Sequence, residues 1–86
     1  MGELSGLPNI GPVVESQLNT GGIHTYEQLK AEGSRQAWLK IKAIDDSACI
    51  HRLYSLEGAI QGIKKSQLPP GTKTELKEFY KSHSSE

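Results

Sequence analysis

The sequence predicts an all-α fold, a small bundle of about five helices with a helix-hairpin-helix-like motif at the N-terminal end. Three observations support this class. Apolar residues recur at helical spacing, capping residues precede several of these runs, and no stretch alternates as a half-buried strand would. The 86 residues are enough for one compact core, so we expect residues 1–86 to form a single domain.

The hairpin motif covers about residues 7–23 and includes the tight turn Leu7-Pro8-Asn9-Ile10-Gly11-Pro12. Asn9 tolerates a positive φ, Gly11 gives the backbone freedom for a sharp reversal, and Pro12 suits a first helical position. The apolar spacing after the turn predicts a helix from about Pro12 to Asn19, which ends at Gly21-Gly22.

Two short helices are expected next. Thr25 is a candidate N-cap, and Gln28 three residues later completes a capping box, so a helix should run to about Glu32. Gly33 ends it. Ser34 is a candidate N-cap for the following helix, which should end near Ala43 and bury Trp38.

The longest helix is predicted from about Ser47 to Lys64, with Asp45 and Asp46 as caps. Its apolar residues step by four and three, which predicts a central core helix, and they are Cys49, Leu53, Leu56, Ile60 and Ile63. Gly58 and Gly62 would lie inside this helix, where each costs roughly 1 kcal/mol relative to alanine. The close approach of another backbone would explain them.

Leu68-Pro69-Pro70-Gly71 cannot continue a helix and is expected to connect to a last, short one. Thr72 with Glu75 predicts a capping box at the start of that helix, which should reach Tyr80. Residues 82–86 are expected to form a flexible tail.

Charge and cysteine content limit the functional classes. The ten basic and ten acidic residues give a formal net charge of zero, which removes a whole-protein field as an argument for nucleic acid. Residues 1–33 hold one base against four acids, and residues 34–86 hold nine bases against six acids. Cys49 is the one cysteine, and neither a signal peptide nor an apolar membrane span is evident. We therefore expect a cytoplasmic protein without membrane contact.

Catalysis finds no support in the residues. The histidines, His24, His51 and His83, lie far apart and lack carboxylates or thiols at metal-ligand spacing. No phosphate-binding loop or nucleophile motif is present. We expect neither an enzyme nor a cofactor, a metal site or a small-molecule substrate.

Several distinctive short sequence motifs follow one another along the chain: LPNIGPVV at 7–14, GIHT at 22–25, AWL at 37–39, AID at 43–45 and LYSLEGAIQGI at 53–63. Together they resemble the C-terminal domain of the TfoX/Sxy family, bacterial regulators associated with competence for DNA uptake. The resemblance implies a helical domain linked to transcriptional control of DNA-uptake genes. Family regulators usually have an additional N-terminal domain, so the chain is expected to be either a standalone relative or a fragment.

The turn also resembles the hairpin of helix-hairpin-helix domains, which presents backbone amides to a phosphate. Two interpretations follow. The hairpin either binds a phosphate or a protein partner, or it only orients two helices. The residues in question are Asn9, Ile10, Gly11, Pro12 and Val13. A basic surface that would assist phosphate binding comprises Arg35, Lys40, Lys64 and Lys65.

We therefore expect a non-enzymatic helical module in DNA-linked regulation, with weak, non-specific nucleic-acid binding at most. The alternative is a protein–protein interaction or self-association module without direct DNA contact, which binds a regulatory protein or forms a homodimer. The two differ in one requirement, because nucleic-acid binding needs basic residues close to Gly11 in space.

Overall fold

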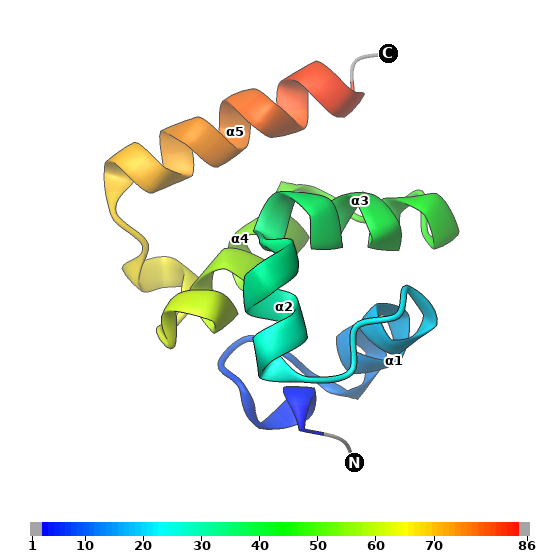
Figure 1. Ribbon diagram of the computed structural model, residues 1–86. Coiled ribbons are helices and arrows are strands. Elements are labelled where there is room, and N and C mark those ends of the chain that lie inside the picture. The colour runs from blue at the N-terminus through cyan, green and yellow to red at the C-terminus, as the bar shows by residue number, and fades with distance from the viewer. Residues whose placement is uncertain (1–2, 85–86) are drawn as a thin grey trace.

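The computed structural model describes residues 3–84, which fold into helices without any strand and so confirm the all-α class (Figure 1). In chain order the helices are η1 (Leu4–Gly6), α1 (Pro12–Thr20), α2 (Tyr26–Glu32), α3 (Ser34–Ile44), α4 (Ile50–Gln61), η2 (Lys65–Gln67) and α5 (Pro70–Ser84), where η marks a 3-10 helix. In Figure 1, η1 and α1 lie at the bottom, α3 and α4 lie in the middle, and α5 crosses them at the top.

All five α-helices contribute to one hydrophobic core. Its buried residues are Leu4, Ile10, Leu18, Ile23, Leu29, Ala37, Trp38, Ile41, Ala48, Leu53, Leu56, Ala59, Leu68 and Leu76. Trp38 is fully buried, as predicted, and its indole Nε1 donates a hydrogen bond to the Cys49 carbonyl at 3.2 Å. That bond satisfies the polar atom of the largest core side chain.

The N-terminal ends of α1, α2 and α3 agree in part with the predictions. Pro12 occupies the first turn of α1, and the Thr25 hydroxyl accepts a hydrogen bond from the Gln28 amide at 3.0 Å. The Gln28 side chain reaches back to the His24 amide at 2.7 Å. The cap predicted for α3 is wrong, since Gly33 (φ 89°) is the N-cap and the buried Ser34 hydroxyl instead donates to Glu57 at 2.6 Å.

α4 is shorter than predicted at both ends. Asp45 Oδ1 accepts a hydrogen bond from the Ser47 amide at 3.0 Å, so this carboxylate stabilises a turn before the helix. Cys49 is the N-cap residue of α4 and is exposed, which makes its predicted place in the core wrong. At the other end Gly62 adopts a left-handed conformation (φ 77°) and stops the helix, so it does not lie in the helix interior.

α5 begins three residues earlier and ends later than predicted, and it includes Pro70 and Gly71, whose predicted place in the connector is wrong. Because the helix starts at Pro70, Thr72 lies inside it, and the predicted capping box of Thr72 with Glu75 is wrong. Residues 82–84 continue the helix and do not form a tail, and residues 85–86 lie outside the described part of the chain.

The hairpin at about residues 7–23 is present in part. Asn9 has the predicted positive φ of 69°, whereas Gly11 has φ −102° and needs no glycine for its conformation. Only the three-residue η1 precedes the turn within residues 3–84, so a full helix-hairpin-helix motif is not confirmed.

Candidate functional site

The candidate site is the start of α1. The first hydrogen bond within the helix runs from the Glu15 amide to the Gly11 carbonyl at 2.9 Å, so the amides of Val13 and Val14 lie ahead of the helical ladder. Pro12 has no N–H to offer. The Val13 side chain is 67% exposed, and the turn therefore presents two backbone amides beside an aliphatic side chain.

The side chain of Asn9 forms its hydrogen bonds with backbone groups of the protein itself. Its Nδ2 donates to the carbonyls of Ser55 (3.4 Å) and Ile63 (3.1 Å), and its Oδ1 accepts from the Lys65 amide at 3.1 Å. A Cβ atom on Gly58 would lie 2.6 Å from that Nδ2 and 2.8 Å from the Ile63 carbonyl. The close backbone approach predicted at Gly58 is therefore present, and Asn9 fixes the turn against the end of α4.

These hydrogen bonds bring two of the candidate basic residues to the turn. The Lys65 backbone is bonded directly to Asn9, Lys64 precedes it, and both side chains are exposed. We call the surface formed by residues 9–13, Lys64 and Lys65 the hairpin edge. It combines helix N-terminal amides with two exposed lysines from a segment more than fifty residues away in the sequence.

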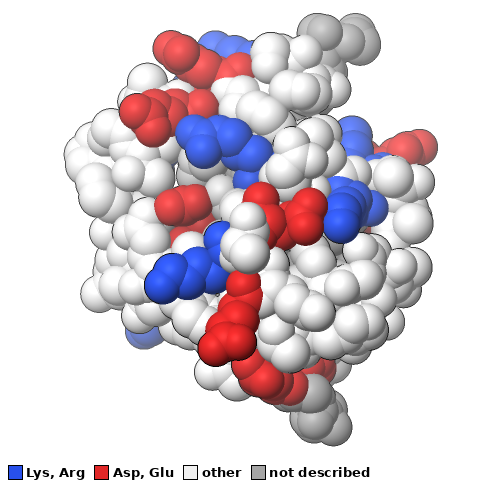
Figure 2. All heavy atoms as spheres, viewed as in Figure 1, with Lys and Arg blue, Asp and Glu red and all other residues white. Residues whose placement is uncertain are grey.

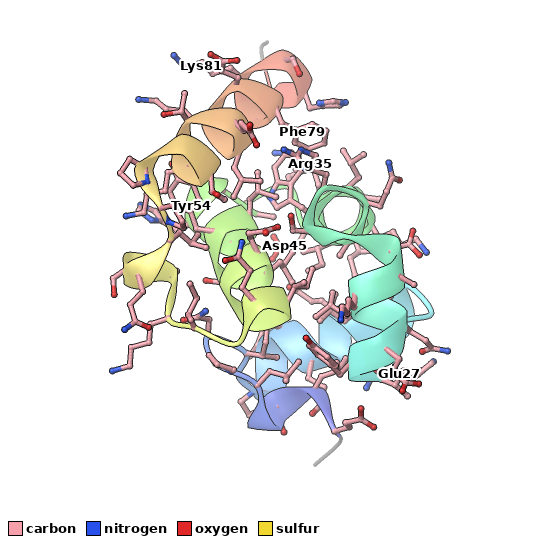
Figure 3. The ribbon with its side chains drawn as sticks, turned by 60° about the vertical axis from the view of Figure 1, so that its left-hand side comes forward. Glu27, Arg35, Asp45, Tyr54, Phe79 and Lys81 are labelled. Carbon is pink, nitrogen blue, oxygen red and sulfur yellow. The ribbon has the colours of Figure 1, made fainter. Side chains whose placement is uncertain are left out.

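The other two candidate basic residues lie elsewhere. Arg35 pairs with Glu75 at 3.8 Å and lies 5.9 Å from the Phe79 ring centroid, between α3 and α5 (Figure 3). Lys40 pairs with Glu32 at 3.4 Å and donates to the Gly21 carbonyl, at the opposite end of α1 from the turn. The four residues therefore do not form one basic surface.

Acidic and basic side chains alternate on the face shown in Figure 2, where red and blue atoms lie side by side. Such pairing reduces the field that any group of lysines exerts on an approaching polyanion. This face offers no broad basic patch.

Sequence reasoning missed the role of Glu15. This residue is 6% exposed, and its Oε2 accepts hydrogen bonds from the amides of Leu4 (3.1 Å) and Ser5 (3.3 Å) at the start of η1. Its position three residues before the buried Leu18 places both on one side of α1, which was the available signal. The carboxylate stabilises the N-terminal segment and adds negative charge close to the hairpin edge.

A polar network connects α1, the turn after α3, and α4. Gln17 donates to Asp45 Oδ2 at 2.9 Å and accepts from the Arg52 guanidinium. Hydrogen bonds from the Ser47 side chain and then from Gln17 lower the pKa of Asp45 below its usual value of 3.8. The network stabilises the ionised carboxylate and holds the three elements together.

The described residues show no metal or pocket chemistry. Residues 3–84 contain no group of three or more His, Cys, Asp or Glu side chains placed to hold a metal ion, and they enclose no pocket. Within the same range, none of the helices has both the length and the apolar character needed to span a membrane.

Fold and surface define a small all-α module whose candidate contacts lie along the hairpin edge. The model of the TfoX C-terminal domain matches residues 1–80, and the chain belongs to this family. Protein Sxy of Escherichia coli (strain K12) is 33% identical over 76 residues, which cover 88% of this chain and 36% of Sxy. The predicted resemblance to this C-terminal domain is confirmed, and the chain spans about a third of the length of Sxy.

Two crystal structures of Listeria monocytogenes proteins have the same fold. An uncharacterized protein in a triclinic form is 46% identical, with a TM-score of 0.95 over 98% of this chain and 96% of that one. A protein of unknown function in a tetragonal form is 49% identical, with a TM-score of 0.90 over 93% of this chain and 98% of that one.

Proposed function

We propose that this chain is a non-enzymatic module of DNA-linked regulation in the cytoplasm, and that its hairpin edge makes weak, sequence-independent contacts with nucleic-acid phosphates. The hydrogen bond from the Lys65 amide to Asn9 Oδ1 (3.1 Å) is the observation that supports this most directly. This bond joins the backbone of one candidate lysine to the turn, which supports a basic contribution near Gly11.

The physical basis is electrostatic. Helix N-terminal amides and the helix dipole favour an anion, and each lysine that neutralises a phosphate releases a condensed counterion. The zero net charge and the nearby Glu15 carboxylate oppose this attraction. We therefore expect a dissociation constant at or weaker than ~10⁻⁴–10⁻⁶ M at physiological salt, the range of non-specific binding.

Fluorescence anisotropy with a labelled duplex, read at several salt concentrations, tests the proposal. The double variant Lys64→Ala/Lys65→Ala should flatten the plot of log K against log salt, by up to ~0.9 for each lost phosphate contact. Lys77→Ala/Lys81→Ala, on the exposed side of α5, changes the net charge equally and is the matched control. It should leave the slope unchanged.

Equal losses in both pairs would show that only net charge matters and would contradict a role for the hairpin edge. Tight binding that barely responds to salt would also contradict the proposal. No binding by the unmodified chain, even at low salt, would leave the second candidate function.

That second function is docking to a regulatory protein. The exposed Val13 (67%) and Ile44 (51%) favour it, because aliphatic side chains gain nothing from a phosphate but are buried at protein interfaces. Val13 is part of the hairpin edge, so a protein partner would use the same turn.

A further inference from the structure

α5 contacts the rest of the molecule through one apolar side. Leu76 is 1% exposed, and Phe79 and Tyr80 pack against the core as partly buried residues. These positions, i, i+3 and i+4, are those by which an amphipathic helix docks in a groove of another molecule. Figure 1 shows α5 as the outermost helix, lying across α3 and α4.

The opposing surface is centred on Trp38. Its ring lies 6.1 Å from that of Phe79 and 5.5 Å from that of Tyr80, centroid to centroid, and both pairs meet edge to face. Such pairs contribute roughly 0.5–1.5 kcal/mol beyond their buried area. We call this surface, formed around Trp38 and Arg35 beneath α5, the α5 groove.

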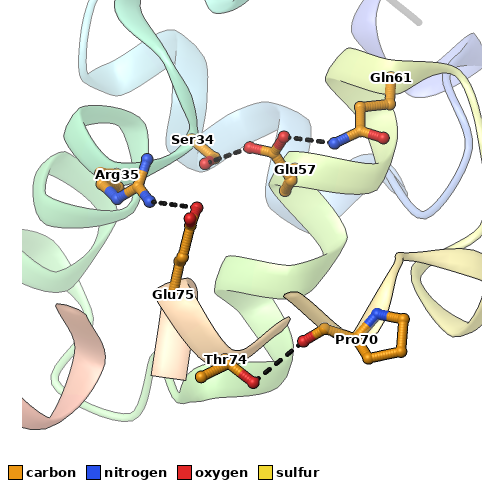
Figure 4. A network of polar contacts seen from close by, with 7 residues as sticks. All are labelled: Ser34, Arg35, Glu57, Gln61, Pro70, Thr74 and Glu75. Atoms are coloured by element: carbon orange, nitrogen blue, oxygen red, sulfur yellow. Dashed lines mark hydrogen bonds and ion pairs between the residues drawn. The ribbon is translucent and has the colours of Figure 1, made fainter. Parts of the chain in front are cut away.

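A charged contact lies at the rim of the groove. The Arg35–Glu75 pair (3.8 Å) joins α3 to α5, as Figure 4 shows, and its side chains are 46% and 74% exposed. Exposed pairs of this kind contribute ~0–1 kcal/mol, so apolar packing supplies most of the attraction between α5 and the groove. The pair nevertheless fixes where opposite charges meet when α5 is docked.

The connector decides which groove α5 occupies. It runs over residues 62–69, begins at the left-handed Gly62, and holds the 3-10 helix η2 between the extended Lys64 (ψ 150°) and the extended, buried Leu68 (ψ 138°). The contacts described above are side-chain contacts that an identical helix would make equally well. The advantage of a chain's own α5 therefore comes from its tether, and a flexible linker of such short length gives an effective concentration on the order of millimolar.

We propose that the α5 groove also accepts α5 from a second copy of this chain, so that two copies form a closed dimer by exchanging this helix. The complementary surface is α5 itself, with its Leu76, Phe79 and Tyr80 anchors and its charge at Glu75. A reciprocal exchange is symmetric and leaves no groove empty. The resulting particle has two hairpin edges, although the exchange does not depend on what those edges bind.

Shortening the connector tests the exchange. Deleting residues 64–67 reduces its maximal reach from roughly 29 Å to roughly 14 Å, at ~3.6 Å per residue. We expect sedimentation to show a dimer at micromolar concentration, with the Trp38 fluorescence of the folded protein. The matched control keeps the length but replaces the same segment, as Lys64→Gly/Lys65→Ser/Ser66→Gly/Gln67→Ser. It should remain monomeric. A monomeric deletion variant would overturn the proposal.

A charge reversal identifies exchange as the cause of any dimer. Chains with Arg35→Glu or with Glu75→Arg each place like charges at the rim of their own groove. Only an exchanged mixed dimer restores opposite charges at both rims. Native mass spectrometry of the mixture at low salt should show mixed dimers severalfold above the statistical proportion.

The charge-reversal experiment also works with the natural connector at near-millimolar concentration, so the test does not depend on folding of the deletion variant. An exactly statistical mixture of dimers would indicate a different interface. Exclusively monomeric protein at that concentration would likewise overturn the exchange.

Discussion

The hairpin edge and the α5 groove belong to different parts of this small molecule and are stabilised by different physical means. At the hairpin, polar side chains bond to backbone groups, and the Asn9 amide alone makes three such hydrogen bonds. At α5, aromatic rings pack around Trp38. Hydrogen bonds require fixed atom positions, whereas apolar packing tolerates the replacement of one identical helix by another.

Element length explains the difference. η1 has three residues and α1 has nine, so neither buries enough apolar surface to fix its own position. The Glu15 and Asn9 side chains supply the missing specificity. α5 has fifteen residues and three anchors, Leu76, Phe79 and Tyr80, so apolar packing contributes most of its docking. We therefore expect mutations at the two ends to have separable effects.

The largest effect is expected at the α5 groove. Trp38→Ala should lower the free energy of unfolding by about 3–5 kcal/mol, because it removes a fully buried side chain and leaves a cavity. Urea denaturation measures the loss, and hydrogen exchange should show α5 amides losing protection before those of α1. Trp38→Phe, which keeps much of the packing but not the bond to the Cys49 carbonyl, should cost less. A loss below ~1 kcal/mol for the alanine variant would contradict this account of the groove.

An intermediate effect is expected where the hairpin meets α4. Gly58→Ala should cost roughly 1–3 kcal/mol, because its Cβ would overlap the Asn9 amide and the Ile63 carbonyl. Thermal denaturation gives the size, and hydrogen exchange should place the loosening at the hairpin. Gly71→Ala is the control, since nothing lies within 4 Å of its added Cβ. Equal effects of the two substitutions would show that the close approach at Gly58 has no energetic consequence.

The smallest effect is expected at the Asp45 network and depends on pH. This network joins α1 to α4 through Gln17 and Arg52 and lies outside both the hairpin edge and the α5 groove. Because the pKa of folded Asp45 lies below 3.8, its stabilisation is present above that pH and is lost as the pH falls through the folded pKa. Asp45→Asn should therefore lower the melting temperature slightly at neutral pH, and the difference should shrink in more acidic solution. A difference that stays constant down to the lowest pH at which the protein folds would rule out this linkage.

Local signals in the sequence predicted much of the fold. The positive φ of Asn9, the Thr25 cap and the burial of Trp38 each depend on a few neighbouring residues or on helical spacing, and all three are correct. The errors at Ser34 and Cys49 arose where several capping residues compete within a few positions. Packing then decides which of them ends up outside the helix.

The sequence by itself determined the helical class, the family resemblance and the main core residues, because a 3.6-residue period and local capping encode them. Only the tertiary structure decided which distant groups meet: Asn9 with Lys65, Glu15 with the start of η1, and Arg35 with Glu75. Those meetings depend on the angles at which helices pack and on where connectors turn. No local pattern specifies these quantities, and they determine which of the candidate lysines lie beside the hairpin.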